Sequence, residues 1–283
     1  RVVLVYRMST TVAQSRQSLD GSSRDARSCD LVIVGGLGHV GLPIGLAFAN
    51  AGLQVVLYDT SAQKAAVVRQ GRMPFIEYGA EPLLKAVLNK TLHLSASADS
   101  ISRARLVMIA VGTPVDEYLN PKLRSILDVF TQLGAHLRPE QTILVRSTVY
   151  PGTCRQILNL LSADGRAWHV AYCPERIVQG YAIKELPELP QLVAGLSEKA
   201  LKDAVELFGR VAPKVITVSV EEAELAKLFA NAWRYIQFAV SNQLFMIAQG
   251  FGVDFNRLRQ VLMDGYGRVA TLPTAGFAAG PCL

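Results

Sequence analysis

Cysteine is scarce in this sequence of 283 residues, and its basic residues form no runs. The four cysteines are too few and too scattered for a disulfide framework, and no C-x-x-C or Cys/His spacing predicts a metal site. The net charge is +6, but without Lys/Arg runs or interleaved aromatic residues a nucleic-acid partner is not expected. We therefore expect a protein of the reducing cytoplasm whose mildly positive surface suits small anionic molecules.

One long stretch lacks charge altogether. Between Leu31 and Tyr58 there is no Asp, Glu, Lys or Arg, which meets the ~18-residue criterion for a helix that crosses a membrane. The same stretch contains Pro43 and several glycines, which break a continuous helix. It is therefore interpreted as a strand, a tight turn and a buried helix, and no membrane association is expected.

Short β-branched runs alternate with helical stretches after Asp30. Near-continuous apolar strands separated by helices predict an α/β fold, a Rossmann-type doubly wound parallel sheet with helices on both faces. The predicted strands are 31–35, 54–59, 105–112, 141–148, 168–175 and 214–219. The predicted helices lie near 40–51, 61–70, 80–90, 122–137, 153–163, 198–211, 220–250 and 254–264.

The pattern divides the chain into three regions. Residues 1–29 are Ser/Arg-rich without hydrophobic periodicity and predict a disordered basic arm. Residues 30–219 contain the alternating strands and helices of the predicted Rossmann-type domain. Residues 220–283 begin with the long helical pattern, which has neither proline nor an internal glycine over 220–250.

A glycine-rich turn follows the first predicted strand and opens the first helix. In "VIVGGLGHVGLPIG", Gly36 permits the tight turn, Gly38 lets the backbone approach a pyrophosphate, and Gly41 allows close helix–strand packing. Asp59 ends the next strand, 18 residues after Gly41, where a carboxylate accepts from ribose hydroxyls and repels the 2′-phosphate of NADP. This pattern predicts an NAD site; the alternative is an α/β protein with a glycine turn and no cofactor.

Further stretches of the sequence resemble the nucleotide-sugar 6-dehydrogenase family of UDP-glucose and UDP-N-acetylhexosamine dehydrogenases. The turn "GLGHVGLP" is similar to the family's G-x-G-Y-V-G-L-P, with His39 in the place of the usual Tyr. The other matching stretches, in family order, are "VGTP" (111–114), "STVYPGT" (147–153), "CPERIVQG" (173–180), "EAELAKLFANAWR" (222–234) and "GPCL" (280–283). The resemblance extends from about Asp30 to Leu283.

The resemblance implies a four-electron oxidation of the C6 alcohol of a UDP-sugar. Two hydride transfers require two NAD, and a cysteine can hold the intermediate aldehyde as a thiohemiacetal that is next oxidised to a thioester and hydrolysed. By resemblance Cys282 is this nucleophile. Lys227 and Asn231 would stabilise the oxyanion, because a cation and an amide donor suit charge that develops on oxygen.

The resemblance also implies a base and two groups of binding residues. Glu175 would act as base, directly or through a water positioned with Thr148, and Arg234 would hold the sugar. The implied cofactor-binding residues are Gly36, Gly38, His39, Val40, Gly41, Asp59, Thr113 and Thr148. The implied substrate-binding residues are Glu175, Arg176, Lys227, Asn231 and Arg234.

The residues themselves leave alternatives open. Glu224, Lys227, Asn231 and Arg234 are spaced 3, 4 and 3 apart and share one helix face, which could equally be the solvated face of an ordinary amphipathic helix. Glu175 could be a structural carboxylate paired with Arg176. Thr148 could simply end its strand.

The substrate is the least defined of these predictions. Two features favour a UDP-N-acetylhexosamine as the substrate. One is Arg234, at a position where UDP-glucose enzymes tend to have an apolar residue, and the other is the segment "PERIVQG". UDP-glucose is the alternative. A β-hydroxyacid-type dehydrogenase would use the helix Lys/Asn pair but not Cys282. A non-catalytic NAD-binding fragment is the remaining alternative.

Two features depart from the family pattern. The cysteine loop is Gly280-Pro281-Cys282 in place of a glycine-rich one, and the family's second, nucleotide-binding domain does not follow. We therefore expect these 283 residues to bind NAD without completing the oxidation. The helix at 220–250 is apolar nearly all round, so it is expected to form a homodimer, as in the family.

Overall fold

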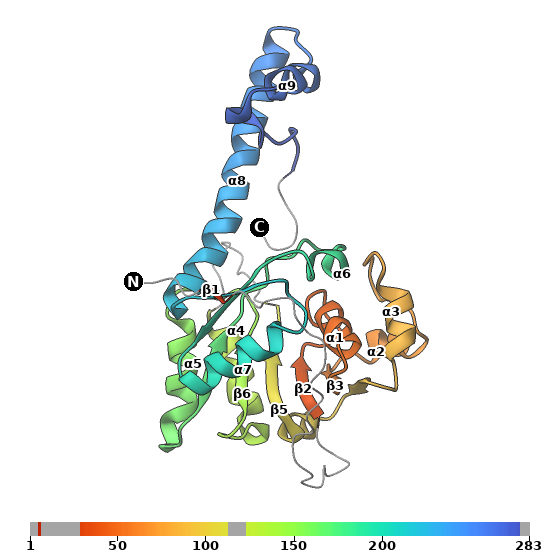
Figure 1. Ribbon diagram of the computed structural model, residues 1–283, viewed down its shortest axis with the longest axis vertical. Helices are drawn as coiled ribbons and strands as arrows, with labels where there is room; N and C mark the ends of the chain where they lie inside the picture. Colours follow the sequence, from red (N-terminus) through yellow and green to blue (C-terminus); the bar gives the residue numbers. More distant parts are fainter. Residues whose placement is uncertain (1–4, 7–28, 113–122, 278–283) are drawn as a thin grey trace. The chain divides into compact units, whose positions relative to one another are not determined.

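Figure 1 shows the computed structural model of the chain, which describes residues 5–6, 29–112 and 123–277. The chain divides into two compact units, Arg1–Leu225 and Ala226–Leu283. The predicted domain boundaries at 29/30 and 219/220 stay predictions. The predicted arm over residues 1–29 lies largely outside the described residues.

The first unit is built on one sheet, whose described strands follow the order β1-β9-β8-β7-β6-β5-β2-β3-β4. Neighbouring strands from β4 to β7 are parallel, β8 runs antiparallel to β7, β9 is parallel to β8, and β1 is antiparallel to β9. The strands are β1 (Val5–Tyr6), β2 (Cys29–Val34), β3 (Val55–Tyr58), β4 (Leu92–Ser95), β5 (Ala104–Ile109), β6 (Thr142–Val145), β7 (His169–Tyr172), β8 (Gln191–Gly195) and β9 (Val215–Thr217). The prediction of a mostly parallel Rossmann-type sheet is confirmed.

Helices connect the strands and cover both faces of the sheet (Figure 1). The α-helices are α1 (Gly41–Asn50), α2 (Ala62–Arg69), α3 (Ala80–Val87), α4 (Leu123–Leu133), α5 (Thr153–Leu161), α6 (Ala182–Glu185), α7 (Glu198–Phe208), α8 (Val220–Gly250) and α9 (Phe255–Met263). Short 3-10 helices are η1 (Ala98–Arg103), η2 (Gly134–His136), η3 (Ser162–Asp164) and η4 (Gly267–Val269).

Two hydrophobic cores lie on opposite faces of the sheet. Leu31 and Ile33 of β2 pack into one core with residues of α1, α2, α3 and α7. Val32 and Val34 of the same strand pack into the other core with residues of α4 and α5. Successive residues of a strand point to opposite faces, so the last four residues of β2 (31–34) are all apolar because both faces of the sheet are buried there.

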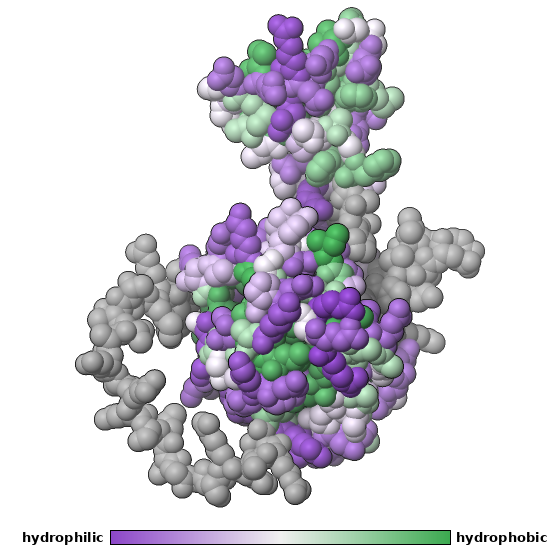
Figure 2. All heavy atoms as spheres, turned by 90° about the vertical axis from the view of Figure 1, so that its right-hand side faces the viewer, coloured by the Kyte–Doolittle hydropathy of each residue, from purple (hydrophilic) through white to green (hydrophobic). Residues whose placement is uncertain are grey.

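The uncharged stretch from residue 31 to 58 forms β2, α1 and β3, as predicted. Among the residues that the structure describes, no helix is long and apolar enough to cross a membrane. Apolar side chains nevertheless reach the surface at several places on the face drawn in Figure 2, interspersed with hydrophilic ones.

Candidate functional site

The sheet has a topological switch point beside β2. β2 pairs in parallel with β3, the next strand along the chain, on one side and with β5 on the other side. In open α/β sheets the connections diverge at such a point and leave a crevice at the carboxyl ends of the strands. The predicted cofactor residues that the structure describes follow β2, β3 and β6 at this edge, so the fold brings them to one side of the sheet.

The turn after β2 has no room for side chains at two of its glycines. A Cβ on Gly36 would lie 2.7 Å from the Cβ of Leu57, and a Cβ on Gly41 would lie 2.4 Å from the carbonyl oxygen of Gly35. The amide of Gly38 donates to the same Gly35 oxygen at 3.0 Å. The backbone can therefore make this sharp, closely packed turn only without side chains at these two positions.

Asp59 is bonded to this turn. Its Oδ2 accepts from the amide of Leu37 at 3.0 Å and its Oδ1 from the amide of Ser61 at 2.9 Å. Leu37 lies between two glycines of the motif, so the structure brings the predicted acid and the predicted turn together. A carboxylate held here can meet the ribose end of a dinucleotide whose phosphates lie at the turn.

The N-terminus of α1 lacks a side-chain cap. Its N-cap residue Val40 makes no side-chain hydrogen bond to the helix, and the first turn has no acidic residue. Ser61, Ser197 and Asp254 cap α2, α7 and α9. The positive end of the helix dipole suits a phosphate. The residues present therefore fit a dinucleotide.

His39 lies in the glycine-rich turn and stacks against the ring of Phe75, with ring centroids 4.0 Å apart. Burial, and then the positive charge of Lys64, lower the pKa of His39 below its usual value. Lys64 was not among the predicted site residues. Its position in α2, five residues after Asp59, gave no motif to recognise.

The loops after β5 and β6 are bonded to each other. Ser147 donates from its Oγ to the carbonyl oxygen of Val111 at 2.6 Å. Thr148, a predicted site residue, comes next and is half-buried. Thr113, predicted in the loop after β5, lies outside the described residues.

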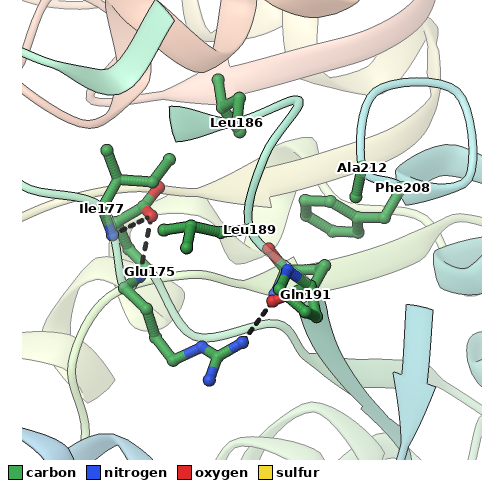
Figure 3. A pocket seen from close by; sticks show the side chains of 9 residues that line it. Glu175, Ile177, Leu186, Leu189, Gln191, Phe208 and Ala212 are labelled. Atoms are coloured by element: carbon green, nitrogen blue, oxygen red, sulfur yellow. Dashed lines mark hydrogen bonds between the residues drawn. The ribbon is translucent and has the colours of Figure 1, made fainter. Parts of the chain in front are cut away.

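Glu175 follows β7. Its carboxylate pairs with the guanidinium of Arg146, which directly follows β6. The alternative in which Glu175 pairs with the side chain of Arg176 is therefore wrong. The guanidinium of Arg176 donates instead to the carbonyl oxygen of Pro190. Figure 3 shows the Glu175 carboxylate beside the backbone of Ile177, and both residues line a cavity of about 10 Å³. That volume holds roughly one water molecule, so this cavity cannot hold a sugar.

Glu224, at the start of α8, is fully buried. Its carboxylate accepts from the amides of Gly152 at 2.7 Å and Cys154 at 3.0 Å, at the N-terminus of α5. A negative charge at a helix N-terminus is favourable, so Glu224 fixes the first turn of α8 to the Rossmann unit.

The other predicted helix residues belong to the second unit. Lys227 is 8% exposed, Asn231 is half-buried and Arg234 is exposed. All three lie on the single continuous helix α8, so their predicted common face is consistent with the helix that forms. Cys282 lies outside the described residues.

A doubly wound sheet, a glycine turn at its switch point and an acid bonded to that turn define a Rossmann-type dinucleotide-binding domain. Residues 30–211 match the family described as "UDP-glucose/GDP-mannose dehydrogenase family, NAD binding domain". The chain belongs to this family, and its cofactor is NAD.

The chain is similar to several members of known name. It is 29% identical over 236 residues to the UDP-N-acetyl-D-mannosamine dehydrogenase of Pyrococcus horikoshii, covering 79% of this chain and 55% of that protein. It is 30% identical over 239 residues to the GDP-mannose 6-dehydrogenase of Pseudomonas putida, covering 80% and 55%. The solved UDP-D-ManNAc dehydrogenase from Pyrococcus horikoshii superposes with a TM-score of 0.79 at 26% identity, covering 87% of this chain and 60% of that one. The chain spans about half the length of the curated relatives it matches.

Proposed function

We propose that this chain serves the NAD-dependent oxidation of the C6 alcohol of a nucleotide sugar to the uronic acid. The observation that carries the proposal is the glycine turn bonded to Asp59, in a chain that belongs to this dehydrogenase family. The favoured substrate is a UDP-N-acetylhexosamine, which is supported by Arg234 and by the similarity to UDP-N-acetyl-D-mannosamine dehydrogenases. UDP-glucose remains the alternative, and the similar GDP-mannose dehydrogenases add GDP-mannose to the substrates to be tested.

NAD, when bound, accepts the hydride in each of the two oxidations. The chain's own nucleophile is Cys282, whose thiolate adds to the aldehyde carbon and forms a thiohemiacetal. Loss of a second hydride gives a thioester, and water then releases the acid and restores the thiol. Lys227 and Asn231 stabilise the oxyanion, because they supply a charge and an amide donor where negative charge develops.

The remaining predicted residues bind and orient. Thr148 positions a water or the nicotinamide end of NAD, while Arg176 and Arg234 hold the substrate. Glu175 is either a base or a structural carboxylate, and Arg146 is its partner in the second role. A β-hydroxyacid-type dehydrogenase shares the Lys227/Asn231 pair but does not need Cys282, which makes this cysteine the residue that separates the two functions.

Cysteine reactivity and product stoichiometry test this proposal. Burial raises the pKa of Cys173 to about 12; burial and then Asp30 raise that of Cys29 to about 11. Burial and then Glu224 hold the pKa of Cys154 well above its usual range. Since the thiolate is the reactive form, iodoacetamide is expected to label Cys282 first, and a bound nucleotide sugar is expected to protect it. Peptide mass spectrometry identifies the labelled site.

The natural protein that contains these residues is then assayed with UDP-N-acetylmannosamine, UDP-N-acetylglucosamine, UDP-glucose and GDP-mannose. We expect two NADH per sugar, loss of turnover in Cys282→Ala with NAD binding unchanged, and normal turnover in the control Cys29→Ala. One NADH per substrate, or normal turnover in Cys282→Ala, would contradict the proposal and favour the β-hydroxyacid alternative.

A further inference from the structure

Glu77 is a buried carboxylate in the loop between α2 and α3, which we call the α2–α3 loop (residues 70–79). Its neighbours Ile76 and Tyr78 are 75% and 60% exposed, whereas Glu77 is only 7% exposed. A buried position normally takes an apolar side chain. Burial raises the pKa of Glu77 above its usual value, so keeping its charge destabilises the folded chain. The carboxylate at this position therefore needs an explanation other than packing.

The carboxylate of Glu77 accepts hydrogen bonds from the loop after β7 and from the start of α6. Its Oε2 accepts from the amide of Gly180 at 3.2 Å, and its Oε1 accepts from the amide of Ile183 at 3.4 Å. Tyr181, the N-cap residue of α6, makes no side-chain hydrogen bond to this helix. Glu77 therefore supplies, from positions 103 and 106 residues away in sequence, acceptors that the start of α6 lacks.

Two further contacts join the same two loops. The amide of Tyr78 donates to the carbonyl oxygen of Gly180 at 2.9 Å, and the rings of Tyr78 and Tyr181 have their centroids 5.2 Å apart. Figure 1 shows α6 beside the loop that leads into α3. Ile76, Tyr78, Val178 and Tyr181 all stay exposed at this junction, so hydrogen bonds contribute much of what holds the two loops together.

The α2–α3 loop contacts two parts of the proposed site. Its Phe75 stacks on His39 of the glycine-rich turn, with ring centroids 4.0 Å apart. Through Glu77 it holds the loop after β7 at Gly180, four residues after Arg176, which the proposed function places at the substrate. One loop therefore connects the turn that binds the dinucleotide to the loop that carries a substrate residue.

We propose that Glu77 is a positioning residue that attaches residues 176–183 to the α2–α3 loop and thereby holds Arg176 in place for the nucleotide sugar. The part of this inference that concerns the substrate rests on the proposed function. The attachment itself is a property of the folded chain and can be measured without substrate.

Amide hydrogen exchange of the 283-residue chain tests the attachment. In Glu77→Gln the side chain keeps its shape, but its amide group cannot accept from both Gly180 and Ile183. The amides of residues 178–186 and of Tyr78 are expected to exchange about tenfold faster than in the wild type. Tyr78 is the decisive position, because its amide bonds to Gly180 and not to the substituted side chain. Glu77→Ala, which removes both acceptors, should accelerate the same amides at least as much.

Glu81→Gln is the matched control. Glu81 is an exposed carboxylate in the first turn of α3, and its Oε1 accepts from the amide of Met73 at 3.2 Å, in the same loop. This control should exchange like the wild type at Tyr78 and at residues 178–186. Unchanged exchange at Tyr78 in both variants of Glu77 would overturn the proposal. Equal acceleration at Leu37 in the glycine-rich turn would also overturn it, because that result indicates a general loss of stability.

Steady-state kinetics of the natural protein that contains these residues test the link to the substrate. Glu77→Gln is expected to raise the KM for the nucleotide sugar about tenfold, because a loosened loop must be ordered on binding, while kcat and the KM for NAD change less than about twofold. A merely structural role would lower kcat through loss of folded enzyme and leave KM unchanged, and that result would overturn the positioning role. If the wild type oxidises no nucleotide sugar, the proposed function fails, whereas the exchange rates still decide on the attachment.

Discussion

Gly41→Ala is expected to weaken NAD binding by about 10- to 100-fold while the sheet remains folded. The added Cβ would lie 2.4 Å from the carbonyl oxygen of Gly35 and 2.8 Å from the Cα of Gly36. Both are backbone atoms, so no side-chain rotation relieves the overlap and the turn must open. Overpacking of this kind costs about 1–3 kcal/mol, and the displaced turn can no longer present its amides to the pyrophosphate.

Isothermal titration with NAD, together with circular dichroism of each variant, measures this effect. Gly134→Ala is the matched control, since a Cβ there has no neighbour within 4 Å and it is not among the glycines with positive φ. This control should bind NAD with wild-type affinity. An unchanged affinity of Gly41→Ala would mean that the dinucleotide does not bind at this turn.

Trp233→Glu on α8 is expected to convert a homodimer into a monomer. Seven large apolar side chains follow one another along this helix and its end at spacings of 4, 3, 4, 4, 3 and 4, which places them on one face. They are Phe229, Trp233, Ile236, Val240, Leu244, Ile247 and Phe251, and each is between 38% and 81% exposed. A continuous exposed apolar stripe of this length marks an interface, and a second copy can cover it with the same stripe.

Light scattering tests this prediction on the purified chain. The wild type is expected at twice the chain mass of 30.7 kDa, and Trp233→Glu at the mass of one chain. Gln249→Glu introduces the same charge on the opposite side of the helix and should remain dimeric. A wild-type chain that is monomeric at all concentrations would refute this role of the stripe.

The sequence predicted most of the Rossmann unit because its signals are local. The run "LVIVG" and the glycines after it define β2 and the start of α1 through short-range geometry, and α8 extends over 220–250 as its pattern predicts. β1, β4 and β8 were not predicted, and β1 lies within the stretch predicted as a disordered arm. β4 has only four residues, two of them polar, and β8 follows Pro190 with a short mixed run, so neither shows a strand period.

The candidate site was predicted less completely because its contacts are distant in sequence. Asp59 was identified by its place after β3, which a motif defines. The pairing of Arg146 with Glu175 joins residues 29 positions apart and depends on β6 and β7 being neighbours. Sequence spacing suggested Arg176, the adjacent cation, as the partner instead. Thr113 and Cys282 lie outside the described residues, so their roles stay predictions.

A competitive titration of the 283-residue chain with NAD and NADP tests the central claim most directly. Asp59 is held at the turn by the amides of Leu37 and Ser61, where its charge opposes a 2′-phosphate. We predict that NAD binds at least about tenfold more tightly than NADP, a difference of ~1.4 kcal/mol. Equal or tighter binding of NADP, or no binding of either dinucleotide, would contradict the account.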